Sequence, residues 1–349
     1  MKRISTFQLA ISFVGVVLGA GFVSGQELWQ FFACFGPAGF LGFALSTGLF
    51  FLVELALLQL SAKTGCTSTG QLIFPGNHPR SSKLIDCLQC LLLFGVLIIM
   101  IAGASAMLHD LTGLSPALCG AVFTLVLLPS ALFELRSIVT VFSVLVPFVG
   151  VTAVFLGLTI LSRQDFQLAA AAGSASALLP NWWVSGFTYA AYNLFGAIAI
   201  LVPFAALIPN TATLRRGLGL GVVFLLVLGF GILAAMMAVP SSGSTELPTA
   251  TLAAQIHPLL GTLYNLLMGL GMFSAALSSI IPLLNQAGLH WPILKTRRRS
   301  FLVLFCLAAY LLSLAGFGNL IGVIYPMFGY ISIPLLFLLV RNWWKTRKK

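Results

Sequence analysis

Glycine and polar residues interrupt an apolar run near the start of the chain. Residues 19–27 read GAGFVSGQE, inside a run from Ile4 to Phe35 that is long enough to cross a bilayer. Glycine costs a helix about 1 kcal/mol relative to alanine, and a charge at the bilayer centre costs at least ~2.5 kcal/mol. Unwound backbone at membrane depth is tolerated only where it is buried in protein or lines a cavity. The stretch therefore predicts a broken helix that lines a binding site, with these candidate site residues: Ala20, Gly21, Phe22, Ser24, Gly25 and Glu27.

A second carboxylate, Glu54, lies in the middle of the apolar run at 38–62. A carboxylate at this depth must face the interior of a helix bundle and find a partner, or stay protonated. Glu27 and Glu54 are thus the two acidic residues that the membrane environment singles out, because the other five lie at span ends or in loops: Asp86, Asp110, Glu134, Asp165 and Glu246.

The composition indicates that these residues belong to a membrane protein. Hydrophobic residues make up 59% of the 349 positions and charged residues only 7%, whereas soluble domains carry about 25% charged residues. Ten apolar runs have spanning length, which predicts one all-α membrane domain over residues 1–349. The runs lie at about 4–35, 38–62, 84–108, 115–133, 138–161, 182–208, 214–238, 258–287, 299–316 and 318–340.

The distribution of the basic residues is explained by a membrane rather than by a nucleic-acid partner. With a cytoplasmic N-terminus and ten spans, every Lys and Arg except Arg163 lies on the cytoplasmic side. This asymmetry is the positive-inside rule, and it predicts a multi-pass protein of the cell inner membrane with both termini in the cytoplasm. Basic residues that face anionic lipid explain the net charge of +11 without a nucleic-acid partner.

The chain also repeats itself in two halves, at about 1–165 and 180–349. Corresponding runs begin about 175 residues apart, as at 38 and 214 or at 84 and 258, and inverted repeats of this kind are typical of transporters. An odd number of spans in each half places the second half upside down. Each half should then break its first span, so the repeat predicts a second break at 190–196. Tyr189, Tyr192 and Asn193 are its candidate solute-binding residues.

Two levels of resemblance follow from these residues. GAGFVSGQE followed by LWQFF is similar to the start of the YkvI-like family of bacterial membrane proteins. Ten spans in a five-plus-five inverted repeat, with the first and sixth spans broken, resemble the leucine-transporter (LeuT) fold of the amino acid-polyamine-organocation superfamily. The resemblance implies a secondary transporter that moves a small organic solute, an amino acid or an amine, by alternating access.

The resemblance also implies a sodium site between the first and eighth spans. Its ligands would be the carbonyls of Gly15, Leu18 and Ala275 and the hydroxyls of Ser278 and Ser279. Oxygen ligands suit a hard cation, and the spacing i, i+3, i+4 places the last three residues on one helix face. The alternative is that these serines bond only to their own backbone. No organic cofactor is expected.

The roles of the two carboxylates stay open. Glu54 could clasp the unwound part of the sixth span near Asn193, as the LeuT fold implies, or take part in binding. Glu27 could satisfy the helix terminus beside it, favour a cationic amine, or carry a proton. A proton-coupled transporter that uses Glu27 and Glu54 is therefore the alternative to sodium coupling.

Other functional classes compete with transport. An enzyme would need a nucleophile with a base in reach, and the four histidines lie near span ends, so we expect no enzyme. A channel would show a filter such as TVGYG, which the chain lacks. A channel of another kind and a nontransporting sensor on the same fold stay open. The loop at 239–258 is a candidate lid, and the oligomeric state is undetermined.

Overall fold

The computed structural model describes residues 4–65, 69–75, 79–132, 150–152, 154–159, 162 and 176–347. The regular structure of these residues is helical throughout. Five helices are long and apolar enough to cross a membrane by length and composition: Ala38–Thr64, Arg80–Thr112, Thr211–Ala238, Pro258–Gly288 and Phe317–Arg347. The total of ten spans and the two repeats stay predictions, and most of the predicted span at 138–161 lies outside the described residues.

The first predicted span consists of several short helices. They are α1 (Thr6–Val17), α2 (Ala20–Ser24), α3 (Gln26–Phe31) and the 3-10 turn η1 (Ala33–Phe35). A capping box starts α1, since the Ser5 hydroxyl accepts from the Gln8 amide and the Gln8 side chain accepts from the Ser5 amide. The chain leaves the helix at Leu18 and Gly19 and again at Gly25, within the stretch that the glycines single out.

The remaining elements form long helices joined by short ones. They are α4 (Ala38–Thr64), α5 (Thr69–Ile73), α6 (Pro79–Thr112), α7 (Pro116–Leu132), α9 (Trp182–Leu201), η2 (Val202–Leu207), α10 (Thr211–Ala238), η3 (Pro240–Ser244), α11 (Pro248–Ile256), α12 (Pro258–His290), α13 (Pro292–Thr296), α14 (Arg298–Ser313) and α15 (Phe317–Arg347). Asparagine side chains cap two of the long helices: Asn181 accepts from the Val184 amide, and Asn210 accepts from the Thr213 amide.

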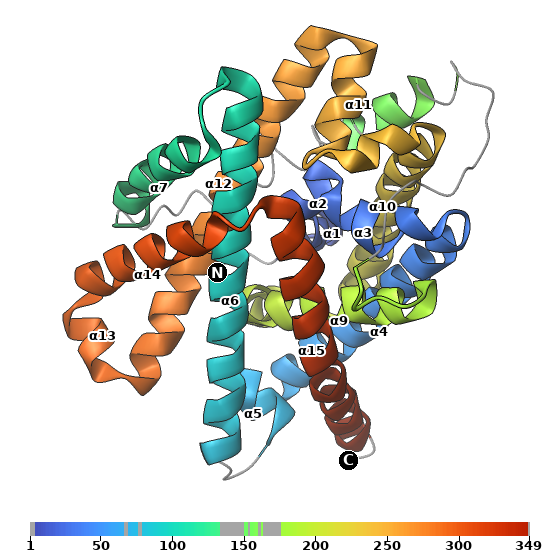
Figure 1. The fold of residues 1–349 in the computed structure, drawn as a ribbon. Helices are drawn as coiled ribbons and strands as arrows, with labels where there is room; N and C mark the ends of the chain where they lie inside the picture. The colour runs from blue at the N-terminus through green and yellow to red at the C-terminus, as the bar shows by residue number, and fades with distance from the viewer. Residues whose placement is uncertain are drawn as a thin grey trace.

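The long helices pack around the broken first span. α6 packs along α12, α15 along α9, and α1 along α10. In Figure 1 the C-terminus and α5 lie at one end of the molecule, and α11 lies at the other. α4 and α9 approach closely because Gly42 and Gly186 face each other, and the Ser46 hydroxyl donates to the Gly186 carbonyl at 2.9 Å.

The predicted break at 190–196 is wrong. α9 is continuous from Trp182 to Leu201, so the predicted sixth span is not interrupted at 190–196. The polar side chain of Asn193 needs no break to find a partner, because its Nδ2 donates to the Tyr189 carbonyl of its own helix at 3.1 Å. The helical pattern changes only at Val202, where the 3-10 turn η2 begins with Pro203, a residue that has no backbone donor.

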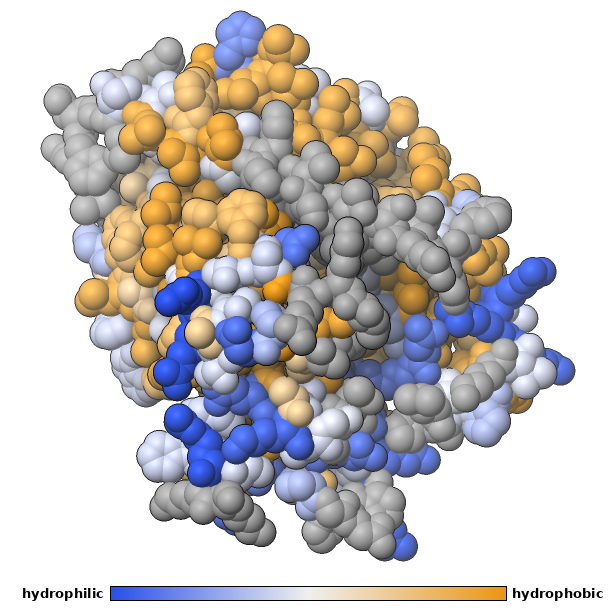
Figure 2. Space-filling view, turned by 180° about the vertical axis from the view of Figure 1, so that it is seen from behind, coloured by the Kyte–Doolittle hydropathy of each residue, from blue (hydrophilic) through white to orange (hydrophobic). Residues whose placement is uncertain are grey.

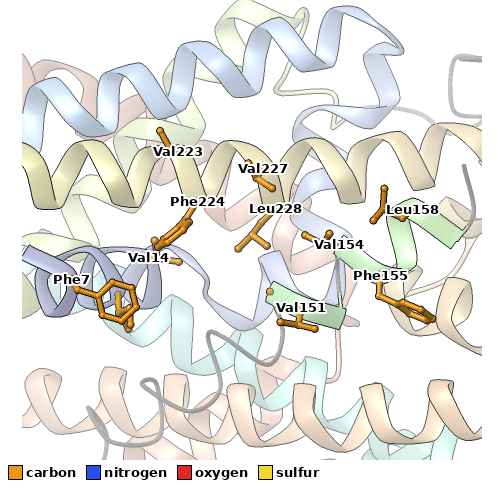
Figure 3. A pocket seen from close by; sticks show the side chains of 12 residues that line it. Phe7, Val14, Val151, Val154, Phe155, Leu158, Val223, Phe224, Val227 and Leu228 are labelled. Atoms are coloured by element: carbon orange, nitrogen blue, oxygen red, sulfur yellow. The ribbon is translucent and has the colours of Figure 1, made fainter.

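The outside of the molecule shows the surface that a bilayer requires. A groove of about 660 Å³ opens between α1, residues 150–151 and 154–158, and α10, and the described residues that line it are apolar throughout, including Phe7, Phe155 and Val227 (Figure 3). Seen from behind, hydrophobic residues cover the upper part of the molecule and hydrophilic residues gather toward its lower end (Figure 2). An apolar surface of this extent suits lipid chains, and it offers nothing to hold a polar solute.

Candidate functional site

A cavity of about 100 Å³ lies at the break in the first span. It brings together residues of the α1–α3 segment, α6, α9, α12 and α15. Seven of the fourteen residues predicted for ion and solute line it: Gly15, Glu27, Tyr192, Asn193, Ala275, Ser278 and Ser279. Four of the five candidate ion ligands and three of the nine candidate solute residues therefore share one cavity, and Leu18 is not in its lining.

The break at Leu18 and Gly19 releases two carbonyls from helical pairing. In a continuous helix the Gly19 amide would donate to Gly15, and the Phe22 amide would donate to Leu18. Here the Gly19 amide donates to the Val17 carbonyl at 2.7 Å, and the Phe22 amide donates to the Gly19 carbonyl at 3.0 Å. The carbonyls of Gly15 and Leu18 thus lose their helical donors.

The two serines of α12 differ in their bonding. Ser279 Oγ donates to the Ala275 carbonyl at 2.7 Å, which is the backbone bond typical of serine in a membrane helix. Ser278 Oγ is buried and has no hydrogen-bond partner among the described residues. A buried hydroxyl without a partner is costly, so Ser278 is the hydroxyl that is available to a ligand in the cavity.

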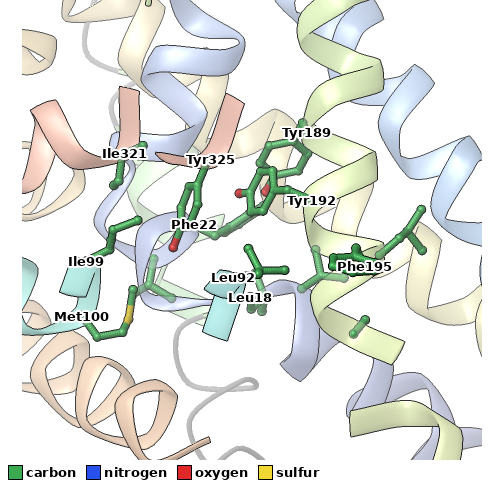
Figure 4. Close-up of a cluster of buried hydrophobic side chains, with 14 of the residues drawn as sticks. Leu18, Phe22, Leu92, Ile99, Met100, Tyr189, Tyr192, Phe195, Ile321 and Tyr325 are labelled. Carbon is green, nitrogen blue, oxygen red and sulfur yellow. The ribbon is translucent and has the colours of Figure 1, made fainter. Parts of the chain in front are cut away.

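Glu27 supplies the only carboxyl group among the described residues that line the cavity. It lies in the first turn of α3 and is 2% exposed. Tyr192 Oη donates to Glu27 Oε2 at 2.7 Å, and the Tyr192 ring stacks on Tyr325 with centroids 4.3 Å apart. Figure 4 shows Tyr189, Tyr192 and Tyr325 together beside Phe22. Residues of α3, α9 and α15 thereby fix one carboxyl group, and no Lys, Arg or His is among the described residues that line the cavity.

Gly21 makes room for this carboxyl group. A Cβ at Gly21 would overlap Oε1 and the side-chain carbons of Glu27. A Cβ at Gly19, in contrast, would have no heavy atom within 4 Å. The two glycines of the motif therefore have different roles: Gly21 is needed for the close approach of Glu27, and Gly19 forms the N-cap of α2.

The second interruption, at Gly25, is held by hydroxyls from other helices. Gly25 has φ of 81°, a left-handed conformation that glycine adopts at little cost. The Val23 carbonyl accepts from Thr249 Oγ1 at 2.6 Å and from Tyr264 Oη at 2.8 Å. The predicted lid at 239–258 folds as η3 and α11, so α11 provides one of the two hydroxyls that replace the missing helical donor.

Several predicted site residues do not line the cavity. Phe22 packs beside Phe43, and Ser24 Oγ donates to the Gly21 carbonyl at 2.9 Å. Tyr189 is buried between the rings of Phe31 and Phe32. These residues shape the break and its surroundings, while the side chain of Ala20 lies outside the described part of the chain.

The sequence interpretation missed Tyr325 and the apolar wall that α6 contributes, which includes Leu92, Val96 and Met100. A tyrosine followed by proline inside the last apolar run was a usable signal for Tyr325. Nothing distinguishes the α6 residues from other apolar residues of that helix, because only the packing of α6 against α9 and α12 brings them to the cavity.

The predicted clasp between Glu54 and the sixth span is absent. Glu54 is fully buried, and neither of its carboxyl oxygens has a hydrogen-bond partner among the described residues. The clasp needs unwound backbone in the sixth span, but α9 is continuous and the Asn193 amide group is already bonded to Tyr189. Glu54 thus needs a proton or a ligand to compensate its burial.

We expect Glu54→Gln to leave the free energy of unfolding within about 1 kcal/mol of the wild type, because a neutral group of equal size replaces an unpartnered carboxyl group. Glu54→Ala should cost about 2 kcal/mol or more, since it leaves a cavity in a packed interior. Unfolding of the purified variants checks both values. Equal destabilisation by Gln and Ala would show that the charge of Glu54 is stabilised by a bound group.

Comparison with known proteins agrees with the fold. No protein-family model matches the chain. The membrane protein YkvI of Bacillus subtilis is 27% identical over 335 residues, which cover 95% of this chain and 94% of YkvI. The protein YyaD of the same organism is 24% identical over 339 residues and covers 94% of each chain.

Solved structures match over nearly the whole chain. An inward-facing conformation of Mhp1 has a TM-score of 0.70, with 15% identity over 99% of this chain and 78% of Mhp1. MhsT in complex with L-phenylalanine has a TM-score of 0.65, with 16% identity over 96% of this chain and 89% of MhsT. The manganese transporter of Eremococcus coleocola has a TM-score of 0.61, with 15% identity over 96% of this chain and 78% of its own.

These matches confirm both resemblances that the sequence indicates. The relative YkvI is a membrane protein, and five of the described helices have the length and apolar character of membrane spans. The chain is therefore a multi-pass membrane protein with a LeuT-type fold, and it is similar to YkvI along almost its whole length.

Proposed function

We propose that the protein is a secondary transporter that moves a small organic solute across the membrane by alternating access, coupled to sodium. One observation carries the proposal: at a broken helix that releases the carbonyls of Gly15 and Leu18, a single cavity brings together Gly15, a buried hydroxyl without a described partner and one carboxyl group. Broken helices that line a cavity at mid-depth are the transporter arrangement. The structural neighbours Mhp1 and the manganese transporter are transporters and not enzymes, in agreement with the expectation of no enzyme.

The residues at the break fit a sodium ion. Sodium would be held by oxygen atoms, as a hard cation requires. The carbonyls of Gly15 and Leu18 have lost their helical donors, and Gly15 and Ser278 both line the cavity. Ala275 and Ser279 line it as well, although the bond between them leaves Ser278 as the more available ligand.

The solute is an amine or an amino acid whose ammonium group binds near Glu27. A buried carboxylate without a counter-charge is costly in a membrane, and the cavity lining has no cationic side chain among the described residues. A cation from the solution compensates this charge, and the aromatic rings of Tyr192 and Tyr325 add a favourable surface for it.

Proton coupling is the second candidate, and the burial of Glu54 favours it. Two carboxyl groups, Glu27 and Glu54, are buried at membrane depth, and Glu54 has no described partner. Intramembrane carboxyl groups of this kind form proton relays in pumps and transporters. Protons would then replace sodium as the coupling ion, with the same cavity for the solute.

The proposed orientation places both termini in the cytoplasm of the cell and the chain in its inner membrane. α11 and η3 then cover the outer end of the site, where Thr249 bonds to Val23 and Gly243 packs on the Trp29 ring. Closure at this end agrees with the similarity to an inward-facing Mhp1.

Uptake by proteoliposomes tests the proposed function. Vesicles that contain the purified protein would receive a mixed pool of labelled amino acids and amines, with an inward sodium gradient, an inward proton gradient or neither. We expect accumulation of one solute class only with the sodium gradient. Accumulation with the proton gradient alone supports the second candidate, and passive equilibration with no dependence on either gradient contradicts both.

We expect Glu27→Gln to weaken solute binding about ten- to a hundredfold, because a contact to a charged group is worth ~1.5–3 kcal/mol. Tyr192→Phe should weaken it less, since this change removes only the hydroxyl that orients Glu27. Binding of the transported solute to both variants, measured at several pH values, shows which variant loses more affinity. Glu27 has no part in the mechanism if Glu27→Gln changes neither the affinity nor its pH dependence.

A further inference from the structure

A second cavity, of about 350 Å³, lies at the end of the molecule that contains the C-terminus. It is formed by the end of α4, the segment from η2 to the start of α10, and the end of α15. Its polar lining includes Gln59, Lys63, Asn210, Arg215 and Arg347. This is the side of the membrane that the basic residues predict to be cytoplasmic.

Three exposed cationic residues line this cavity without a described acidic residue among them. Lys63, Arg215 and Arg347 line it, and no described Asp or Glu does. Lys63 Nζ donates to the Thr346 carbonyl at 3.2 Å, which directs the ammonium group toward the end of α15. The Arg347 guanidinium lies 4.7 Å from the centre of the Trp343 ring. Like charges that share one cavity repel each other, so an anion bound between them is favoured.

The start of α10 adds to the attraction for an anion. α10 has 28 residues, and its first turn borders the cavity at Thr211 and Arg215. The Asn210 side chain accepts from the Thr213 amide only, so the amides of the preceding residues have no partner from this cap. The positive end of a helix dipole and free amides together suit a phosphate oxygen.

The other wall of the cavity is apolar. Leu58 and Ala62 of α4, Ala205 and Ile208 after α9, and Leu214 of α10 form it. A free phosphate ion gains nothing from such a wall, whereas a phospholipid places glycerol and acyl carbons beside its phosphate. Basic pockets between membrane helices on the cytoplasmic side suit anionic headgroups.

We propose that this cavity binds the phosphate of an anionic phospholipid from the inner leaflet, with Lys63, Arg215 and Arg347 as its cationic ligands. The lipid would connect the ends of α4, α10 and α15. Of these, α15 lines the cavity at the break, while α4 packs on α9 and α10 packs on α1.

The test measures thermal unfolding of the purified full-length protein in neutral detergent. Phosphatidylglycerol, phosphatidylcholine or inorganic phosphate is added at increasing concentration. The pocket variant carries Lys63→Gln, Arg215→Gln and Arg347→Gln. The control variant carries Arg216→Gln, Arg341→Gln and Lys345→Gln, which remove the same charge from exposed positions that do not line the cavity.

Phosphatidylglycerol should stabilise the wild type and the control more than phosphatidylcholine does. The pocket variant should need roughly a hundredfold more phosphatidylglycerol, at roughly fivefold per lost charge. If the pocket variant fails to fold, Arg215→Gln alone should lose roughly fivefold, since Arg215 has no bond to a described residue that folding requires. Equal loss in the pocket and control variants overturns the site, and equal stabilisation by inorganic phosphate overturns the lipid as its ligand.

Discussion

Replacing Ser278 by alanine should lower the sodium affinity of the protein about ten- to a hundredfold. The Ser278 hydroxyl is buried in the cavity without a described partner, and a contact to a charged group is worth ~1.5–3 kcal/mol. The carbonyls of Gly15 and Leu18 remain in the variant, so the fold should persist while the ion binds weakly. The sodium dependence of uptake, or of a conformational probe, gives the affinity.

The neighbouring serine is the matched control. Ser279→Ala should have a smaller effect, because its hydroxyl already donates to the Ala275 carbonyl. The double variant should lose at least as much affinity as Ser278→Ala, and sodium should then no longer shift the conformational equilibrium, since a ligand shifts it only by its differential affinity. If all variants share the sodium curve of the wild type, the serines only cap their helix, and the coupling ion would be a proton at Glu27 or Glu54.

Gly21→Ala should weaken solute binding at least tenfold. The added Cβ would overlap the carboxyl group of Glu27, which must leave its position in the cavity and give up the bond from Tyr192. Loss of a contact to a charged group accounts for a tenfold effect or more. Overpacking should also lower the free energy of unfolding by about 1–3 kcal/mol.

Gly19→Ala separates this effect from a general need for glycine. A Cβ at Gly19 has no heavy atom within 4 Å, and Gly19 has φ of −56°, which alanine adopts readily. Binding of the transported solute by both variants gives the comparison. Equal losses would mean that the motif needs flexible glycines, and no loss in either variant would mean that Glu27 is not part of the solute site.

The first break could be predicted because its cause is local. Glycines, a serine and Glu27 lie within an apolar run. Unwound backbone at membrane depth is tolerated only where it is buried in protein or lines a cavity. The prediction of the second break was wrong because it rested only on symmetry between the two halves of the chain. Asn193 is polar, but its side chain donates to the Tyr189 carbonyl one turn earlier, so this polar residue can be buried in a continuous helix.

The assembly of the cavity could be predicted only in part. The resemblance brought Gly15, Ala275 and Ser278 together, and the structure places all three in the lining. Tyr325 was missed because its role depends on stacking with Tyr192, a contact between helices that are distant in sequence. Spacing along one helix predicts which face a residue shares, but not which helix that face meets.

The most direct test of a shared cavity for ion and solute is the affinity for the transported solute, measured in the purified protein at increasing sodium concentration. We predict that the solute binds more tightly as sodium rises, that sodium binds more tightly by the same factor when the solute is present, and that Ser278→Ala removes this dependence. A solute affinity that is the same at every sodium concentration would contradict the sodium-coupled site.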